Sequence, residues 1–106
     1  MLGIRDVPRW RIDPLRCLWE HTRQPERCTT PRREALSRSD PTDHIVGVPN
    51  NVSFVDLTDE ICTGERCPGV RNGLVTYRDQ HHLTATFAAS LAPALDEALV
   101  QGVMQR

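Results

Sequence analysis

The sequence has no lysine, no long apolar run and few aromatic residues. All 13 of its basic side chains are arginine, a bias that we attribute to GC-rich coding rather than to chemistry. No apolar run approaches the roughly 18 residues of a membrane-spanning helix, which excludes a span within this sequence. The 13 basic residues face 14 acidic ones, and phosphate binding usually needs a basic excess. Nucleic acid is therefore not expected as a main partner.

Cysteines, by contrast, are present in two close pairs, Cys17 with Cys28 and Cys62 with Cys67. An even number of cysteines in local pairs favours two short disulfide loops, which form in oxidising compartments. Sequence alone leaves three connectivities open, and free thiols or a metal site are alternatives. Neither pair has the two-residue gap of a zinc ribbon or knuckle. We therefore expect disulfides.

A secretory signal is missing. The first ten residues, Met1–Trp10, carry Arg5 and Asp6 where a signal peptide has its apolar stretch. Either the cysteines stay reduced in the cytoplasm, or sequence upstream of Met1 directs export. We favour the second and expect residues 1–106 to be the C-terminal part of a single domain in a longer exported protein.

The first half of the chain shows little periodicity. Leu2–Ile4 is apolar and is expected to end a buried strand, since Pro8 cannot continue a central strand. From Trp10 to Val48 the chain is polar and rich in arginine and proline, which predicts irregular structure. Within it, Arg32–Ser39 is expected to form a helix of two turns.

The second half is more regular. Asn51–Leu57 has the β-branched and aromatic residues of a strand, and Thr58–Cys62 is expected to form a helical turn. Asn72-Gly73 is a strong turn signal before a short strand at Leu74–Tyr77. Together these predict a small hairpin closed by the Cys62–Cys67 disulfide.

The last element is the clearest. Apolar residues recur every four positions at Leu83, Phe87, Leu91, Leu95 and Leu99. This spacing predicts an amphipathic helix over Thr84–Val103, with Thr84 as its N-cap and a bend near Ala89–Pro93, because proline removes a helix hydrogen bond. Strands, polar connections and a closing helix predict an α/β fold with two or three strands in an incomplete sheet.

Asp79 and His82 are the candidate catalytic residues. They lie between the last predicted strand and the terminal helix, and ligand sites of open α/β sheets gather at the carboxyl ends of strands. An aspartate three residues before a histidine can accept a hydrogen bond from one ring nitrogen and stabilise the imidazolium that forms when the other takes a proton. The spacing alone is weak, and the simpler interpretation is that Asp79 caps a turn while His82 covers the start of the helix.

The surrounding pattern resembles one family. The segments that carry the resemblance are Val55-Asp56-Leu57-Thr58, Ile61-Cys62 with Cys67, Tyr77–Thr84 with the Ala/Leu-rich helix, and Gly3–Pro8. They resemble the C-terminal part of the SGNH (GDSL-like) hydrolase domain that is appended to bacterial membrane acyltransferases of family three, the O-acyltransferases of cell-surface polysaccharides. The resemblance spans nearly the whole chain.

The resemblance implies a fold, a site and partners. The fold is an incomplete three-layer, flavodoxin-like α/β sheet. His82 is implied as the general base and Asp79 as its orienting carboxylate, whereas His81 occupies a variable position and is expected to face solvent. The implied partners are an acylated glycan or acyl-donor substrate and a membrane acyltransferase domain, at the extracytoplasmic face of the cell envelope, with no cofactor and no metal ion.

The family's nucleophile block, Gly-Asp-Ser, has no counterpart in the sequence. The serines are Ser37, Ser39, Ser53 and Ser90, and none stands in such a block. An ester-cleaving site needs a nucleophile and oxyanion donors as well as a base, so we predict no acyl transfer by these residues alone. Two alternatives remain: a non-catalytic, disulfide-stabilised extracytoplasmic binding module, and a metal site at Cys62, Cys67 and the His81-His82 pair.

Overall fold

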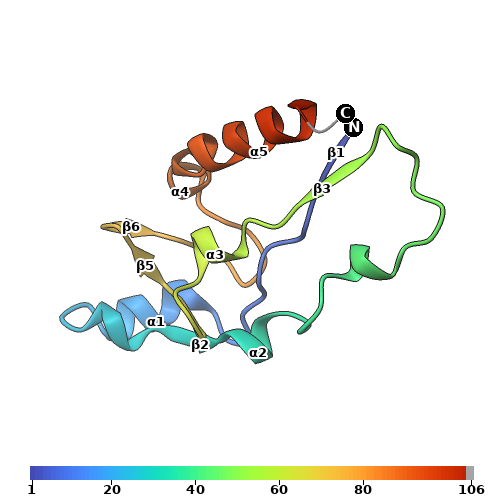
Figure 1. Ribbon diagram of the computed structural model, residues 1–106. Helices are drawn as coiled ribbons and strands as arrows, with labels where there is room; N and C mark the ends of the chain where they lie inside the picture. Colours follow the sequence, from blue (N-terminus) through green and yellow to red (C-terminus); the bar gives the residue numbers. More distant parts are fainter. Residues whose placement is uncertain (105–106) are drawn as a thin grey trace.

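Six short strands form three separate two-stranded sheets in the computed structural model, which describes residues 1–104 (Figure 1). The strands are β1 (Leu2–Ile4), β2 (Thr29–Pro31), β3 (Ser53–Val55), β4 (Arg66–Pro68), β5 (Val70–Arg71) and β6 (Leu74–Val75). The helices are α1 (Pro14–Glu20), α2 (Arg32–Ala35), α3 (Thr58–Ile61), α4 (Ala85–Ser90) and α5 (Ala92–Met104), with 3-10 turns at Pro25–Arg27 and Pro41–His44. The predicted α/β class is confirmed, with its strands distributed over three pairs.

The pairings join distant and local segments. β1 and β3 are parallel, with Leu2 opposite Ser53 and Ile4 opposite Val55. β2 and β4 are antiparallel, and β5 and β6 form an antiparallel hairpin. Figure 1 shows the connection from α2 to β3, in green, running away from the other elements. The predicted strand at Asn51–Leu57 is shorter than expected, because only the three residues of β3 find partners on β1.

The hairpin forms at the predicted turn. Asn72 and Gly73 have φ values of 54° and 77°, and a type I′ turn requires positive φ at both central residues. The strand predicted at Leu74–Tyr77 ends at Val75, where its pairing with β5 ends. The disulfide between Cys62 and Cys67 does not close this hairpin; it spans the preceding bridge between Thr63 and Arg66.

The segment Trp10–Val48 was expected to be irregular, and this expectation is wrong in its first part. α1 begins at Pro14, where a missing N–H costs nothing, and the Asp13 carboxylate caps it by accepting a hydrogen bond from the Leu15 N–H at 3.0 Å. α1 has no long apolar stripe, so periodicity did not reveal it. The helix predicted at Arg32–Ser39 is also too long, since the backbone becomes extended at Leu36 and α2 ends at Ala35.

The predicted burial of β1 is also wrong. Its side chains are half-buried at best, and Ile4 is 53 % exposed. β1 pairs with β3 and with no other strand among residues 1–104. A two-stranded ribbon leaves most of its surface in contact with solvent, which explains the exposure.

The terminal helix breaks where the sequence predicted a bend. The Thr84 hydroxyl accepts a hydrogen bond from the Phe87 N–H at 3.1 Å, which confirms Thr84 as the N-cap. α4 ends at Ser90 and α5 begins at Ala92. Pro93 then lies in the first turn of α5, where its missing N–H and fixed φ are tolerated.

A small core holds these elements together. Its buried members are Trp10, Ala35, Ile61, Cys62, Cys67, Tyr77 and Phe87. The radius of gyration is 15.3 Å, whereas a compact domain of about 100 residues has about 13 Å. The chain is therefore more extended than its length requires. Within the described part of the chain, no helix has both the length and the apolar character that a membrane crossing requires.

Both predicted disulfides are confirmed, as Cys17–Cys28 and Cys62–Cys67. Their sequence separations are 11 and 5 residues, for which chain entropy gives about 3 and about 2 kcal/mol of stabilisation. Cys62 and Cys67, however, are both fully buried in the core, whereas in the other pair Cys28 is buried and Cys17 is half-buried.

We therefore expect the Cys62–Cys67 bond to contribute more to stability than the Cys17–Cys28 bond, although it closes the shorter loop. Replacing Cys62 and Cys67 by serine also places two hydroxyl groups in the core, at about 1–3 kcal/mol for each one left unsatisfied. The C17S/C28S variant places one hydroxyl in a buried position, at Cys28. The C62S/C67S variant should therefore lose up to about 2 kcal/mol more unfolding free energy than C17S/C28S, measured by urea denaturation. A larger loss for C17S/C28S would mean that loop entropy alone sets the ranking.

Candidate functional site

Asp79 and His82 lie on a tight loop that follows the hairpin. An antiparallel bridge between Tyr77 and Leu83 closes this loop, and the Arg78 N–H donates to the His82 carbonyl at 2.9 Å. Inside it, Asp79 Oδ1 accepts hydrogen bonds from the N–H groups of His81 and His82, each at 2.8 Å. Asp79 is thus a turn cap, and this cap also fixes the direction of its carboxylate.

The two candidate side chains are in contact. His82 Nδ1 lies 3.0 Å from Asp79 Oδ1 and 2.9 Å from Oδ2. An ionised carboxylate only accepts hydrogen bonds, so the proton of the neutral imidazole must sit on Nδ1. Nε2 then carries the lone pair. The imidazole is 58 % exposed and the carboxylate 48 %, so a reacting group can approach Nε2.

The electrostatics of the loop favour the ionised carboxylate. The pKa of Asp79 is lowered from 3.8 to about 2. The largest cause is the hydrogen bond from the His81 N–H, and the hydrogen bonds from the ring and the N–H of His82 add to it. Asp79 is therefore charged wherever an imidazole could act as a base. It can orient His82 and balance the charge of an imidazolium at neutral pH.

The segment Pro8–Arg11, from the other end of the sequence, anchors the loop. The buried hydroxyl of Tyr77 donates to the Pro8 carbonyl at 2.6 Å. The backbone N–H of Trp10 donates to the Gln80 carbonyl, and the Gln80 side chain donates to the Arg11 carbonyl, both at 3.0 Å. Burial raises the pKa of the Tyr77 phenol, with the Asp6 charge adding to the effect, so the hydroxyl remains a donor.

Sequence reasoning missed these supports. Trp10 had no assigned role, yet it is buried and its ring lies 6.1 Å from that of Tyr77. Gln80 lies inside the quoted motif but carries no recognisable signal of its own. His81 is exposed, as the resemblance implied, and its Nδ1 accepts a hydrogen bond from Arg9 Nε at 3.0 Å.

A nucleophile is not found beside the histidine. Among the described residues, no serine hydroxyl hydrogen-bonds His82. Ser39 contacts a different imidazole, His44, with 3.2 Å between Oγ and Nε2, and Ser90 donates to the Phe87 carbonyl. The loop therefore holds an imidazole oriented by a carboxylate, without a serine hydroxyl bonded to it in the described part of the chain.

The metal alternative is wrong, because the Cys62 and Cys67 sulfurs are joined to each other. A second group, Cys17, His21 and Cys28, has ligand atoms within 4.8 Å of one another. Its two sulfurs are also joined as a disulfide. A metal needs the thiolate form of cysteine, so neither group offers thiolate ligands in this structure.

The Tyr77 hydroxyl should be required for stability. In the Tyr77→Phe variant the ring still packs, but the buried Pro8 carbonyl loses its donor, which costs about 1–3 kcal/mol. We expect the free energy of unfolding in urea to fall by that amount and amide exchange at His81 and His82 to accelerate. A loss too small to resolve would show that water replaces the hydroxyl.

The carboxylate of Asp79 should titrate near pH 2. Its pKa is lowered, so the contacts that it makes contribute fully above its ordinary pKa of 3.8 and are lost as the pH falls through about 2. The side-chain carboxyl carbon, followed by NMR, reports this midpoint. In the His82→Ala variant we expect the midpoint to rise but to stay below 3.8, because the His81 N–H remains. An unchanged midpoint would mean that the His82 imidazole does not contact the Asp79 carboxylate in solution.

The comparisons with known proteins bear on the same elements. No curated protein and no solved structure matches the chain. A family model described as "SGNH domain (fused to AT3 domains)" matches residues 1–97, a range that includes both disulfides and the loop with Asp79 and His82. The match covers most of the chain and agrees with the resemblance seen in the sequence. The chain therefore belongs to the family of SGNH domains that are described as fused to AT3 domains.

Proposed function

We propose that the chain supplies the base and its orienting carboxylate to an acyl-transfer or ester-hydrolysis site. His82 is the general base and Asp79 orients it. The contact between His82 Nδ1 and the Asp79 carboxylate at 2.9 Å is the observation that carries the proposal, and membership of an SGNH family supports it. The serine nucleophile belongs to polypeptide outside residues 1–106, since no Gly-Asp-Ser block occurs within them.

The chemistry follows from the lone pair on Nε2. As a serine oxygen attacks an acyl carbonyl, His82 Nε2 takes the hydroxyl proton, and Asp79 balances the imidazolium. His82 then gives that proton to the departing alkoxide, which leaves an acyl-serine. In the second half, His82 takes the proton of a sugar hydroxyl or of water as that oxygen attacks the acyl carbonyl. His82 then returns the proton to the departing serine oxygen, which restores the free serine and releases the new ester or the free acid.

The unpaired edges of β1 and β3 offer a place where the polypeptide that carries the serine can bind. β1 and β3 pair only with each other among residues 1–104, so the outer edge of each carries backbone groups that can pair with further strands. An added strand next to this ribbon would extend the parallel sheet. Polypeptide that covers the exposed pair of Asp79 and His82 would also exclude water and strengthen the electrostatic interaction between them.

The two disulfides support a place outside the cytoplasm, because disulfides persist in oxidising compartments. Together with the family's fusion to AT3 domains, they suggest a domain at the extracytoplasmic face of the cell envelope that works with a membrane acyltransferase domain. The substrate class that we propose is an O-acylated cell-surface glycan or its acyl donor.

His82 should be indispensable in the joined protein. The test needs the chain expressed in frame with polypeptide that carries a Gly-Asp-Ser block, found by translating the DNA upstream of Met1. Release of acetate from an O-acetylated glycan is then measured. We expect His82→Ala to lower kcat by about 10³–10⁴-fold or more, and Asp79→Asn to lower it by a comparable factor, because a triad acts as a unit.

His81→Ala is the matched control, since it removes an exposed imidazole from the same loop and keeps the backbone N–H that caps Asp79. It should stay within about threefold of the parent, whereas a triad base costs orders of magnitude. Equal activity of the His82→Ala and His81→Ala variants would remove His82 from the mechanism. The absence of activity in a folded joined protein would favour the alternative of a non-catalytic binding module.

A further inference from the structure

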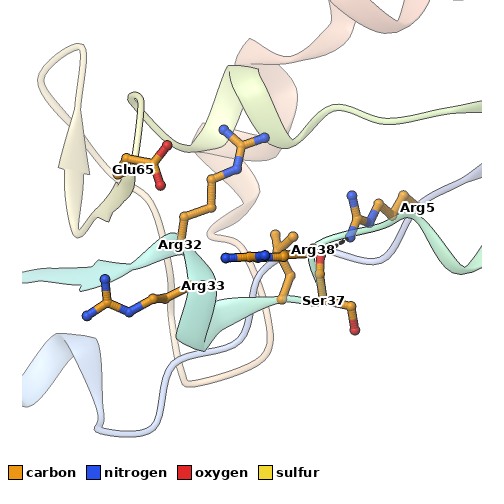
Figure 2. A pocket seen from close by; sticks show the side chains of 7 residues that line it. Arg5, Arg32, Arg33, Ser37, Arg38 and Glu65 are labelled. Atoms are coloured by element: carbon orange, nitrogen blue, oxygen red, sulfur yellow. Dashed lines mark hydrogen bonds between the residues drawn. The ribbon is translucent and has the colours of Figure 1, made fainter.

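One cavity of the molecule is lined mainly by arginine, and neither Asp79 nor His82 lines it. It has a volume of about 440 Å³, which is within the usual range for small-molecule sites. The side chains that line it include four arginines and one glutamate: Arg5, Arg32, Arg33, Arg38 and Glu65. They come from the segment after β1, from α2 and the residues that follow it, and from the residue before β4. Figure 2 shows them in close view, with Arg38 between Arg32 and Arg5.

Two of the arginines are held by hydrogen bonds and form the frame of the cavity. The Arg5 side chain is 9 % exposed, and its guanidinium donates to the Asp56 carboxylate at 2.9 Å and to the Ser37 carbonyl at 2.6 Å. Hydrogen bonds from Thr58 and from Arg5 outweigh the effect of burial and lower the pKa of Asp56, so this pair stays charged. Arg32 donates to the Asp59 carboxylate at 2.7 Å and to the Gly64 carbonyl at 3.2 Å.

The other two arginines are not neutralised. Among the described residues, Arg33 and Arg38 form no ion pair, and both are exposed. Glu65 is the one acidic residue that lines the cavity, and it forms no ion pair with any of the four within the same part of the chain. Asp56 and Asp59 are already matched by Arg5 and Arg32. The cavity therefore keeps an excess of positive charge although the whole chain has a net charge of −1.

We propose that this cavity binds one oxyanion group, a carboxylate or a phosphate, of an anionic ligand, with Arg33 and Arg38 as its main donors. The guanidinium group is planar and offers paired N–H donors that match both oxyanions. A long polyanion such as nucleic acid would need a basic surface, which this near-neutral chain does not provide. The proposal does not depend on catalysis by His82.

Contacts through Arg9 link this cavity to the loop that carries Asp79 and His82. A smaller cavity of about 190 Å³ shares Arg5, Leu36 and Ser37 with it and extends to Arg9. Arg9 Nε in turn donates to the His81 ring.

The test is a titration of the ¹⁵N-labelled, fully oxidised chain with inorganic phosphate and, separately, with D-glucuronate. Ionic strength is held constant with sodium chloride, and the arginine Nε–H signals are followed by NMR. We expect saturable shifts at Arg33 and Arg38 with at least one of the two ligands. The tighter ligand identifies whether phosphate or carboxylate is preferred.

Three variants make the result specific. R33Q/R38Q should weaken binding about tenfold or more, the effect of losing a charge-assisted hydrogen bond. R23Q/R27Q removes two exposed arginines that do not line the cavity, and it should bind within about twofold of the parent. Glu65→Gln should bind more tightly, because it removes a repulsive charge. The proposal is overturned if neither ligand saturates, or if R23Q/R27Q weakens binding as much as R33Q/R38Q.

Discussion

The hydrogen bond from the Tyr77 hydroxyl to the Pro8 carbonyl joins two segments that are 69 residues apart in the sequence. It lies in the core, where an unmade hydrogen bond is costly. The backbone bond from Trp10 to Gln80 and the side-chain bond from Gln80 to Arg11 lie beside it. Together these contacts hold the loop of Asp79 and His82 against the rest of the chain.

The extended segment after β1 serves both candidate sites. Arg5, at its start, is part of the frame of the arginine-lined cavity. Pro8, Trp10 and Arg11, further along, bind the loop that carries Asp79 and His82. A segment without regular structure can do this because its unpaired carbonyls and N–H groups are available to other parts of the chain.

Small sheets and a thin core leave much apolar surface in contact with solvent. Ile4 and Phe54 on the β1–β3 ribbon are 53 % and 40 % exposed, and Leu99 and Val100 on α5 are 43 % and 57 % exposed. Of the apolar face that the sequence predicted for the terminal helix, Phe87 is fully buried, Leu83, Leu91 and Leu95 are half-buried, and Leu99 is exposed. The two disulfides offset part of the missing burial, because they restrict the unfolded chain.

Local signals in the sequence determined the turn at Asn72-Gly73, the cap at Thr84 and the break before Pro93. Each depends on the conformational limits of a few neighbouring residues, which is why no long-range information was needed. The spacing of Asp79 and His82 likewise follows from the turn that lies between them. α1 had a local signal as well, in Asp13-Pro14, but lacked the apolar periodicity that reveals longer helices.

Only the tertiary structure decided which distant groups meet. The pairing of β1 with β3, the anchoring of Gln80 by Trp10 and Arg11, and the placement of Arg5 and Arg38 on one cavity bring together residues that are far apart in the sequence. Short strands and isolated arginines carry no pattern that specifies a partner. Their neighbours are chosen by the burial of a shared core and by the need to satisfy buried polar groups, both of which depend on the whole fold.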